Sequence, residues 1–295
     1  MDVGKMTGMI APMVVPFDEA GELDEAAFRA EARYLLDHGV DGISSGGSTG
    51  EGALLSDAEL RRCLELIQAE NTRKTPVYAG VIRNSTREVI RAGLDAKACG
   101  ANALLVTPVF YHGATEEGNF QFYREIGESV QLPLIIYNVV ASNLITPPQV
   151  LRLCELEWVI GVKQVDPVRL AEIAALSRGG TNIYAACDQM LYGTYTAGAC
   201  GAFSAMVTIA PELCQAQWQA FRRGDQAEAM AIQHKMVPIV MTYLQAPYPG
   251  KVKALVNLQG RSGGLPRHPI LPVTDPELLG RMRAALSGAG LATVK

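Results

Sequence analysis

The sequence predicts a (β/α)8 barrel followed by a C-terminal helical extension, and three observations lead to this fold class. Short, continuously apolar runs alternate with longer segments of helical periodicity. Eight such pairs are complete near residue 223, and eight is the number of units that closes a barrel. The rest of the chain shows helical segments only. We therefore expect a barrel over residues 1–223 and a helical extension packed on it over residues 224–295.

The expected strands are apolar throughout rather than alternating, as in parallel strands that helices cover. They are Met9–Val15, Gly42–Ser45, Pro76–Val81, Ala103–Thr107, Leu134–Tyr137, Val159–Lys163, Ile183–Ala186 and Gly201–Ser204. An open, doubly wound sheet is the alternative, and the lack of a GxGxxG segment after the first strand weakens it.

Helical periodicity fills the segments between the strands. The expected helices are Glu25–His38, Asp57–Glu70, Thr86–Cys99, Glu117–Ser129, Pro148–Cys154, Val168–Ser177, Gln189–Ala197 and Pro211–Arg223. Three more follow in the extension, at Asp225–Tyr243, Lys251–Leu258 and Pro276–Ser287. No flexible linker precedes them, so we expect an appended cap that packs on the barrel or on another subunit.

Composition narrows the classes of partner and compartment. The chain is 48% hydrophobic, and 26 basic and 30 acidic residues give a net charge of −4. The charges form no basic run, so we expect no nucleic-acid partner. The N-terminal segment lacks a signal-peptide pattern, and no apolar run approaches the roughly 18 residues that span a bilayer. The six cysteines form no CxxC pair, and the four histidines have no metal-ligand spacing. We expect a cytoplasmic protein with reduced thiols, no membrane partner and no metal.

Lys163 is the first candidate for chemistry, because it ends the strand segment WVIGVK, which holds no other charge. A lysine at the end of a buried strand loses hydration, which lowers its pKa and frees the amine for attack on a carbonyl. The alternative is a lysine that reaches out of the barrel mouth or pairs with Asp166. The residues alone leave both interpretations open.

Tyr137 ends the preceding strand segment, LPLIIY, and should therefore stand beside Lys163. A phenol can donate and accept a proton, which suits the formation and breakdown of a carbinolamine. The alternative is an aromatic residue at the rim with its hydroxyl in water.

The segment GGSTGEG, residues 46–52, follows the second strand and predicts an anion-binding turn. Backbone N–H groups around Gly47, with the hydroxyls of Ser48 and Thr49, suit a carboxylate or phosphate. The spacing differs from a nucleotide-binding loop, which ends in GK[ST]. Most glycine-rich turns are only turns, so this signal is weak when taken alone.

These segments together resemble the dihydrodipicolinate synthase / N-acetylneuraminate lyase family of class I, Schiff-base-forming aldolases and lyases. The matching segments are GGSTGE at 46–51, PVYAGV at 76–81, TPVFY at 107–111, YNV at 137–139, GVKQ at 161–164 and the tail YPGKVKALVNLQGR. The resemblance covers nearly the whole chain in order. It implies a barrel with a C-terminal helical extension, commonly a homotetramer, that needs no metal or organic cofactor.

By the same resemblance, Lys163 forms the Schiff base with a 2-oxo acid and Tyr137 transfers protons. Ser48 and Thr49, with their backbone amides, bind the carboxylate of a pyruvate-like portion. The protonated imine then acts as an electron sink for aldol cleavage, dehydration or deamination.

Departures from the family pattern bear on the substrate. Dihydrodipicolinate synthases usually carry an arginine for a second carboxylate after YNVP, where this chain has Ser142. The second tyrosine of the usual TPYY, which completes a proton relay across a dimer, is Phe110 here, with Tyr111 as a substitute. Both differences argue against the lysine-pathway synthase.

The spellings GSTGE and VKQ resemble the sialic acid lyases more closely, yet the acidic pair that binds the sugar chain there is Asp188-Gln189 here. We therefore expect a lyase of a smaller 2-keto-3-deoxy-type acid or of a hydroxypyrroline carboxylate. The groups expected to face the variable end of the substrate are Gln164, Val165, Asp188 and Ser204, and packing at the barrel mouth is their alternative role.

Three other functions stay open at this stage. The first is 4-hydroxy-tetrahydrodipicolinate synthase, which condenses pyruvate with aspartate semialdehyde. The second is a non-catalytic homologue that binds pyruvate without turnover. The third is a barrel for a phosphorylated sugar, which the lack of a glycine-rich turn after the last two strands disfavours.

Overall fold

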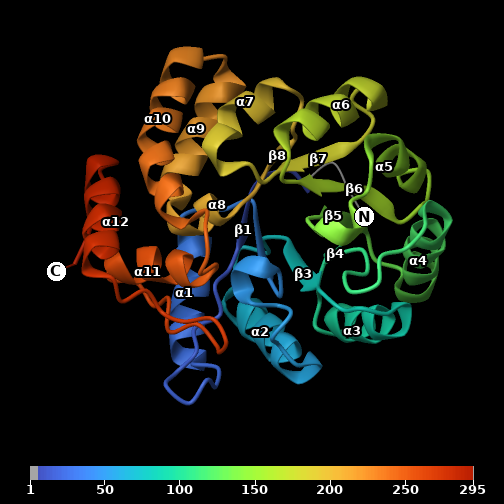
Figure 1. Cartoon of the computed structure of the whole chain (residues 1–295), viewed down its shortest axis with the longest axis horizontal. Helices are drawn as coiled ribbons and strands as arrows, with labels where there is room; N and C mark the ends of the chain where they lie inside the picture. Colours follow the sequence, from blue (N-terminus) through green and yellow to red (C-terminus); the bar gives the residue numbers. More distant parts are fainter. Residues whose placement is uncertain (1–5, 295) are drawn as a thin grey trace.

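The computed structural model describes residues 6–294, and they form a closed barrel of parallel strands surrounded by helices (Figure 1). The strands are β1 (Gly8–Pro12), β2 (Gly42–Ser45), β3 (Val77–Val81), β4 (Ala103–Val106), β5 (Leu134–Asn138), β6 (Val159–Gln164), β7 (Asn182–Ala185) and β8 (Gly201–Phe203). Each strand pairs with its neighbours in sequence, and β8 pairs with β1 to close the ring. The predicted (β/α)8 barrel is confirmed.

The helices follow the strands in the predicted order. They are α1 (Glu25–Asp37), α2 (Asp57–Glu70), α3 (Thr86–Ala98), α4 (Glu116–Val130), α5 (Pro147–Leu153), α6 (Pro167–Ser177), α7 (Leu191–Thr196), α8 (Ala205–Ile209) and α9 (Pro211–Arg223). Side-chain caps explain several starting points: Asp24, Ser56 and Ser85 each accept a hydrogen bond from a backbone N–H in the first turn.

The short helix α8 was not predicted, and two predicted boundaries differ from the structure by two residues or more. The first strand was expected to continue to Val15, but β1 ends at Pro12, whose carbonyl accepts a hydrogen bond from Thr208 of α8. The helix expected from Gln189 starts as a 3-10 turn over Asp188–Met190, and α7 begins only at Leu191. In both cases the chain leaves regular structure at the C-terminal end of the barrel.

Alternation along the strands separates an inner core from an outer one. On β4, Leu105 belongs to the inner cluster with Ile135 and Tyr137 of β5, while Leu104 and Val106 pack outward against the helices. The strand register then pairs Tyr137 with Lys163 of β6. Fold and register alone therefore bring these two side chains together.

A close approach of two glycines shapes the loop after β2. A Cβ atom on Gly80 of β3 would lie 2.4 Å from the backbone C of Gly46 and the N of Gly47. Gly46 itself has a φ of +85°, which L side chains rarely adopt. The loop that carries Ser48 can therefore lie against β3 only because both positions are glycine.

The C-terminal extension consists of α10 (Gln226–Tyr243), α11 (Gly250–Leu258) and α12 (Pro276–Gly288). In Figure 1 these orange and red helices lie at one side of the barrel. α10 packs on α9 and on the turn at Asp188–Met190, and α12 packs on α10 and α11. The extension thus reaches the strand ends where the candidate residues lie. The division of the chain at residue 223 stays a prediction.

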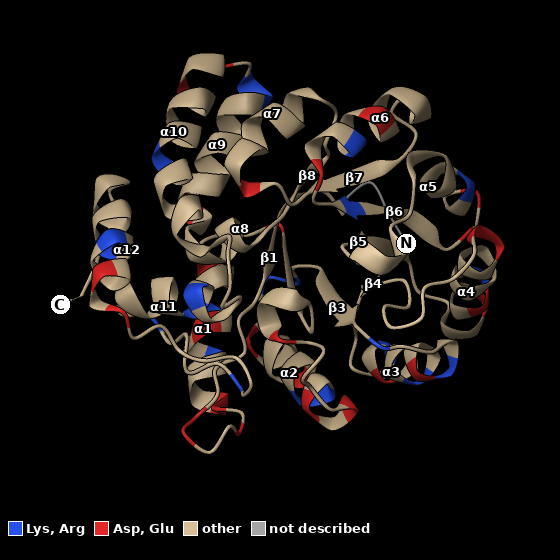
Figure 2. Cartoon of the chain, viewed as in Figure 1, with Lys and Arg blue, Asp and Glu red and all other residues tan. Residues whose placement is uncertain are grey.

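Charged residues of both signs alternate along the outer helices in the view of Figure 2. A small anion would therefore be held by local groups rather than drawn in by a single-sign surface. Among residues 6–294, no helix combines the length and the apolar character that crossing a bilayer requires.

Candidate active site

A cavity of about 360 Å³, named here the Lys163 cavity, opens at the C-terminal ends of the strands. Its lining residues are Ser48, Thr49, Tyr137, Val139, Lys163, Val165, Ala186, Asp188, Phe203, Ser204, Ala205, Tyr243, Leu244 and Tyr248. Lys163 and Asp188 are the charged residues of this lining. Active sites of (β/α)8 barrels lie at this end.

Lys163 is buried inside the barrel, with an exposed fraction of 4%. Its Nζ lies 4.3 Å from the ring centroid of Tyr137 and 4.6 Å from that of Phe203. Asp166 is occupied elsewhere, because it caps α6 through the N–H groups of Val168 and Arg169. The alternative of a lysine in solvent or paired with Asp166 is therefore wrong.

Two tyrosine–hydroxyl pairs lie at one end of the Lys163 cavity. The hydroxyl of Tyr137 donates to Ser48 Oγ at 3.0 Å. The hydroxyls of Thr49 and Tyr248 share a hydrogen bond of 2.7 Å, in which either can donate. Ser48 and Thr49 begin a short 3-10 turn, so adjacent residues present both hydroxyls to the cavity.

Gly47 shapes this turn from outside the cavity lining. Its carbonyl accepts hydrogen bonds from the N–H groups of Gly50 and Gly52, and Glu51 N–H donates to the carbonyl of Ser48. These three N–H groups are therefore used inside the turn. The N–H groups of Ser48 and Thr49 donate to no backbone carbonyl within residues 6–294, so the turn can offer these two amides as well as the two hydroxyls.

Asp188 also lines the Lys163 cavity and is buried. Its Oδ1 accepts a hydrogen bond from Ser204, and its Oδ2 accepts one from Tyr243 of α10. Burial raises the pKa of Asp188, while these two hydrogen bonds and the charge of Lys163 oppose the rise. The expected residues Asp188 and Ser204 thus form one hydrogen-bonded cluster beside Lys163.

The geometry agrees with the match to a family model. Residues 5–287 match the model described as the dihydrodipicolinate synthetase family. The chain belongs to this family. Its members are lyases of the aldolase type, and this chain is a lyase.

Named relatives cover nearly the full chain. The 4-hydroxy-tetrahydrodipicolinate synthase of Bradyrhizobium diazoefficiens is 32% identical over 97% of this chain and 98% of that protein. The enzyme of the same name from Hyphomonas neptunium is 33% identical over 97% and 99%.

Solved structures show the same fold. A dihydrodipicolinate synthetase from Pseudomonas aeruginosa, described as putative, superposes with a TM-score of 0.91 at 30% identity, covering 96% of this chain and 99% of that one. YagE, a prophage protein of the dihydrodipicolinic acid synthase family from E. coli K12 solved in complex with pyruvate, gives a TM-score of 0.90 at 26% identity, covering 97% and 99%.

Within this family member, Gln164 and Tyr111 do not line the Lys163 cavity. Gln164 follows Lys163 and points to the other side of β6, where its Oε1 accepts the N–H groups of Val165 and Asp166. Tyr111 has an exposed fraction of 75% and packs edge-on against His112. The role expected for Tyr111, in a proton relay across a dimer, stays a prediction, as does a substrate contact of Gln164.

The two positions that depart from the synthase pattern contact each other. Ser142 Oγ donates to the carbonyl of Phe110 at 2.7 Å, so it braces a loop. Phe110 lines a second cavity of about 350 Å³, named here the Phe110 cavity, which shares Ser48, Val139 and Tyr248 with the Lys163 cavity. Neither lining contains an arginine.

Sequence reasoning missed three of the four aromatic side chains that line the Lys163 cavity: Phe203 on β8, and Tyr243 and Tyr248 from the extension. Phe203 directly precedes Ser204 at the end of the predicted eighth strand, so its position in the sequence could have suggested that it lies near the site. The only signal for Tyr248 was its place in the tail YPGKVKALVNLQGR, which was used for the resemblance alone.

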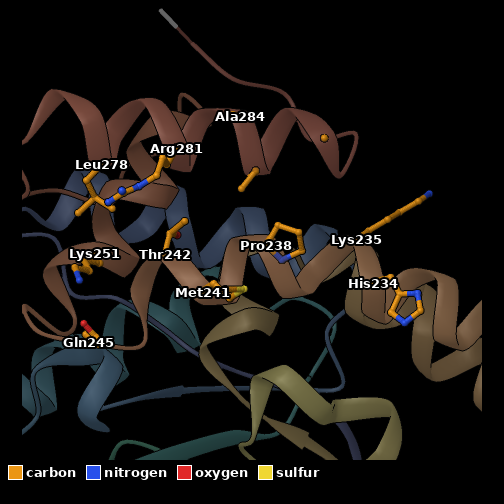
Figure 3. Close-up of a pocket in the computed structure, with 12 residues that line it drawn as sticks. His234, Lys235, Pro238, Met241, Thr242, Gln245, Lys251, Leu278, Arg281 and Ala284 are labelled. Carbon is orange, nitrogen blue, oxygen red and sulfur yellow. The ribbon is translucent and has the colours of Figure 1, made fainter.

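A larger cavity of about 880 Å³ lies between α10 and α12. Figure 3 shows His234 and Lys235 on one helix opposite Arg281 and Ala284 on the other. His234 and Lys235 are exposed, and no buried lysine or tyrosine lines this cavity. Of these two cavities, the smaller Lys163 cavity is the one that combines a buried lysine with tyrosines.

Proposed function

We propose that this chain is a Schiff-base lyase that holds a 2-oxo acid as an imine on Lys163. The observation that carries the proposal is the buried amine between two aromatic rings, with Tyr137 in register beside it and two hydroxyl pairs within the same cavity. A buried, pre-arranged site of this kind suits an amine nucleophile with a phenol as proton donor and acceptor.

The first half of the proposed reaction forms the imine. The Lys163 amine adds to the carbonyl carbon, and the carbonyl oxygen takes up a proton. The nitrogen gives up a proton and the hydroxyl leaves as water, which yields a protonated imine. Tyr137, hydrogen-bonded to Ser48, supplies and accepts these protons, while Ser48 and Thr49 hold the carboxylate.

The second half uses the imine nitrogen as an electron sink. In aldol cleavage, the C4 hydroxyl loses its proton, the C3–C4 bond breaks, and its electron pair moves toward nitrogen as an enamine. In dehydration, a C3 proton leaves first, and the enamine then expels the C4 hydroxyl as water. In deamination of a hydroxypyrroline carboxylate, Lys163 first displaces the ring nitrogen from C2, which leaves it as an amine on C5. The same loss of water then forms a C5 enamine, and water hydrolyses its imine tautomer to an aldehyde and ammonia. Asp188 with Ser204 and Tyr243 is the group available at that end.

We propose a small 2-keto-3-deoxy-type acid or a hydroxypyrroline carboxylate as the substrate. The absence of an arginine from both cavity linings supports a substrate without a second carboxylate. Hydroxyl groups on the substrate would meet the polar cluster of Asp188 and Ser204.

A second candidate is 4-hydroxy-tetrahydrodipicolinate synthase, acting on pyruvate and aspartate semialdehyde. The names of the relatives at 32% and 33% identity favour it. Ser142 argues against it, because it stands where the synthases usually carry an arginine, and its hydroxyl donates a hydrogen bond to the carbonyl of Phe110. A non-catalytic homologue that binds pyruvate is a third candidate.

Borohydride trapping with pyruvate tests the proposal. The intact protein should gain the mass of one reduced pyruvate adduct, and Lys163→Ala should gain none. An unchanged mass, or an adduct on Lys163→Ala, contradicts the Schiff base. A panel of 2-keto-3-deoxy acids, hydroxyproline-derived imines and aspartate semialdehyde, assayed for pyruvate, ammonia and 2-oxoglutarate semialdehyde, separates the three candidates.

Assembly and compartment are also proposals. We propose a homotetramer built as a dimer of dimers, which the exposed side chains of Phe110 and Tyr111 near the Phe110 cavity support. Light scattering after size-exclusion chromatography tests it. A cytoplasmic location is supported by six free cysteines, and fractionation of the source cell tests that location.

A further inference from the structure

Tyr248 reaches the Lys163 cavity from the C-terminal extension. It lies between α10 and α11, and it is partly buried. Its ring lines both the Lys163 cavity and the Phe110 cavity, together with Ser48 and Val139. Of these three shared residues, Tyr248 carries the only phenol, so it stands at the junction of the two cavities.

The two hydroxyl pairs leave one donor each for a ligand. In the first pair, Tyr137 donates to Ser48, so the Ser48 proton is free to donate onward. In the second pair, one proton lies between Thr49 and Tyr248, and the other hydroxyl proton is free. The pairs of Tyr137 with Ser48 and of Tyr248 with Thr49 can therefore each donate one hydrogen bond to a ligand. Two such donors match the two oxygens of a carboxylate.

The environment of Tyr248 keeps it a proton donor. Burial raises the pKa of its hydroxyl, and the neighbouring hydroxyl of Tyr137 raises it further, while the hydrogen bond with Thr49 opposes this. The carboxylate of Asp188 also raises the pKa of Tyr248 and so favours the protonated phenol. A carboxylate in this corner is therefore met by neutral donors.

We infer that Tyr248 is a substrate-positioning residue whose phenol, paired with Thr49, completes in the same chain the hydroxyl set that binds the carboxylate of the 2-oxo acid. This inference rests on the proposed function for its substrate class. The extension then contacts the substrate carboxylate directly, in addition to packing on the barrel. Tyr243 serves a different group, because its hydroxyl donates to Asp188.

The test compares pyruvate with pyruvamide, its neutral amide, on the wild type and on Tyr248→Phe. Each compound is titrated, and the fraction of protein that carries the borohydride-reduced adduct is read by mass spectrometry to give a dissociation constant. The preference for pyruvate is the dissociation constant for pyruvamide divided by that for pyruvate. Tyr248→Phe should lower this preference about tenfold, the size expected for losing one hydrogen bond to a charged group. Tyr78→Phe is the matched control, since Tyr78 lies buried in the inner core outside the cavity lining and should leave the ratio unchanged.

A second variant keeps the inference testable if Tyr248→Phe folds poorly by circular dichroism. Thr49→Val removes the partner hydroxyl while keeping the shape, and it should lower the same ratio. The double variant should be little worse than either single variant, because the pair acts as one donor chain. Strictly additive losses contradict the paired arrangement.

Failure of the inference and failure of the proposed function have different signatures. If wild type traps pyruvate and Tyr248→Phe keeps the full preference for pyruvate, the inference is overturned and the Schiff base stands. Equal losses for pyruvate and pyruvamide also overturn it, because they indicate a packing role. If wild type traps nothing, calorimetry of pyruvate binding decides: a Tyr248-dependent affinity keeps the carboxylate site, and its absence rejects both.

Discussion

The carboxylate of Glu51 forms a buried ion pair with Lys253, joining the loop that carries Ser48 to α11 of the extension. Both side chains are almost fully buried, with exposed fractions of 0% and 1%. Glu51 Oε2 also accepts the N–H of Arg267 at 2.8 Å. The loop therefore depends on the extension for its position, which links folding of residues 224–295 to the hydroxyl pairs.

Replacing Lys253 by Met should lower the free energy of unfolding by about 3–5 kcal/mol, because it leaves the Glu51 carboxylate buried without its cation. Urea denaturation followed by circular dichroism measures the loss. Glu51→Gln combined with Lys253→Met should recover part of it, since the uncompensated charge is gone. A double variant as unstable as Lys253→Met would contradict the charge argument.

Replacing Tyr137 by Phe should lower kcat roughly 100-fold or more, the usual loss when a positioned acid–base group is removed. The ring that lies 4.3 Å from the Lys163 amine is kept, so the fold should be unchanged. Samples trapped with borohydride at successive times after mixing with the substrate should show slower imine formation. Ser48→Ala should slow it less, because Tyr137 retains its own proton. Equal rates for wild type and Tyr137→Phe would remove Tyr137 from the proton path.

The barrel and the Lys163–Tyr137 pair could be predicted because both depend on local patterns. Continuous apolar runs mark covered parallel strands, and consecutive strands of a barrel are neighbours, so residues ending β5 and β6 must meet. The place of Ser48 and Thr49 in the site could be predicted for the same reason, because their glycine-rich turn directly follows β2. The family match then agrees with the resemblance in those motifs.

Contacts across long sequence distances could not be predicted in this way. Thr49 and Tyr248 are 199 positions apart, and nothing in either segment specifies how the extension returns to the barrel mouth. Gln164 was misplaced because it adjoins Lys163, although neighbours on a strand face opposite sides. Tyr111 was proposed from the family pattern, by its place next to Phe110, and its exposed fraction of 75% in one chain leaves a role across a dimer as a prediction.

Replacing Asp188 by Asn should separate imine formation from turnover. Imine formation with pyruvate should change by only a few fold, because we propose that the carboxylate binds at Ser48 and Thr49. Turnover of the hydroxylated substrate found in the panel should fall about tenfold or more, the loss that follows removal of a charged hydrogen-bond partner. Trapping and turnover assays on one preparation measure both. Equal losses in both assays would assign Asp188 to structure.

Replacing Gly80 by Ala should weaken pyruvate binding by moving the loop after β2. The added Cβ would lie 2.4 Å from backbone atoms of Gly46 and Gly47, which cannot rotate away. Overpacking of this kind costs about 1–3 kcal/mol of stability. Gly280→Ala in α12 is the control, because a Cβ there meets nothing within 4 Å. Thermal unfolding and pyruvate trapping should change for Gly80→Ala alone.

Acid should weaken the attachment of the extension through Glu59 of α2, which forms an ion pair with Arg267. The hydrogen bond from Arg267 lowers the pKa of Glu59 from 4.5 to about 2. A carboxyl whose pKa is lower in the folded state stabilises the fold above its unfolded pKa and loses that contribution as the pH falls. Its share is therefore full above about pH 4.5 and is lost between 4.5 and 2.

Glu59→Gln should flatten the dependence of the melting temperature on pH in that window, and it should lower stability at neutral pH modestly, because the pair is partly exposed. Melting curves from neutral pH down to about pH 2 measure both effects. Glu277→Gln, from the exposed pair with Arg281 in α12, should leave the acid profile unchanged. If Glu59→Gln loses stability in acid as steeply as wild type, the pair of Glu59 and Arg267 is not the source of the acid dependence.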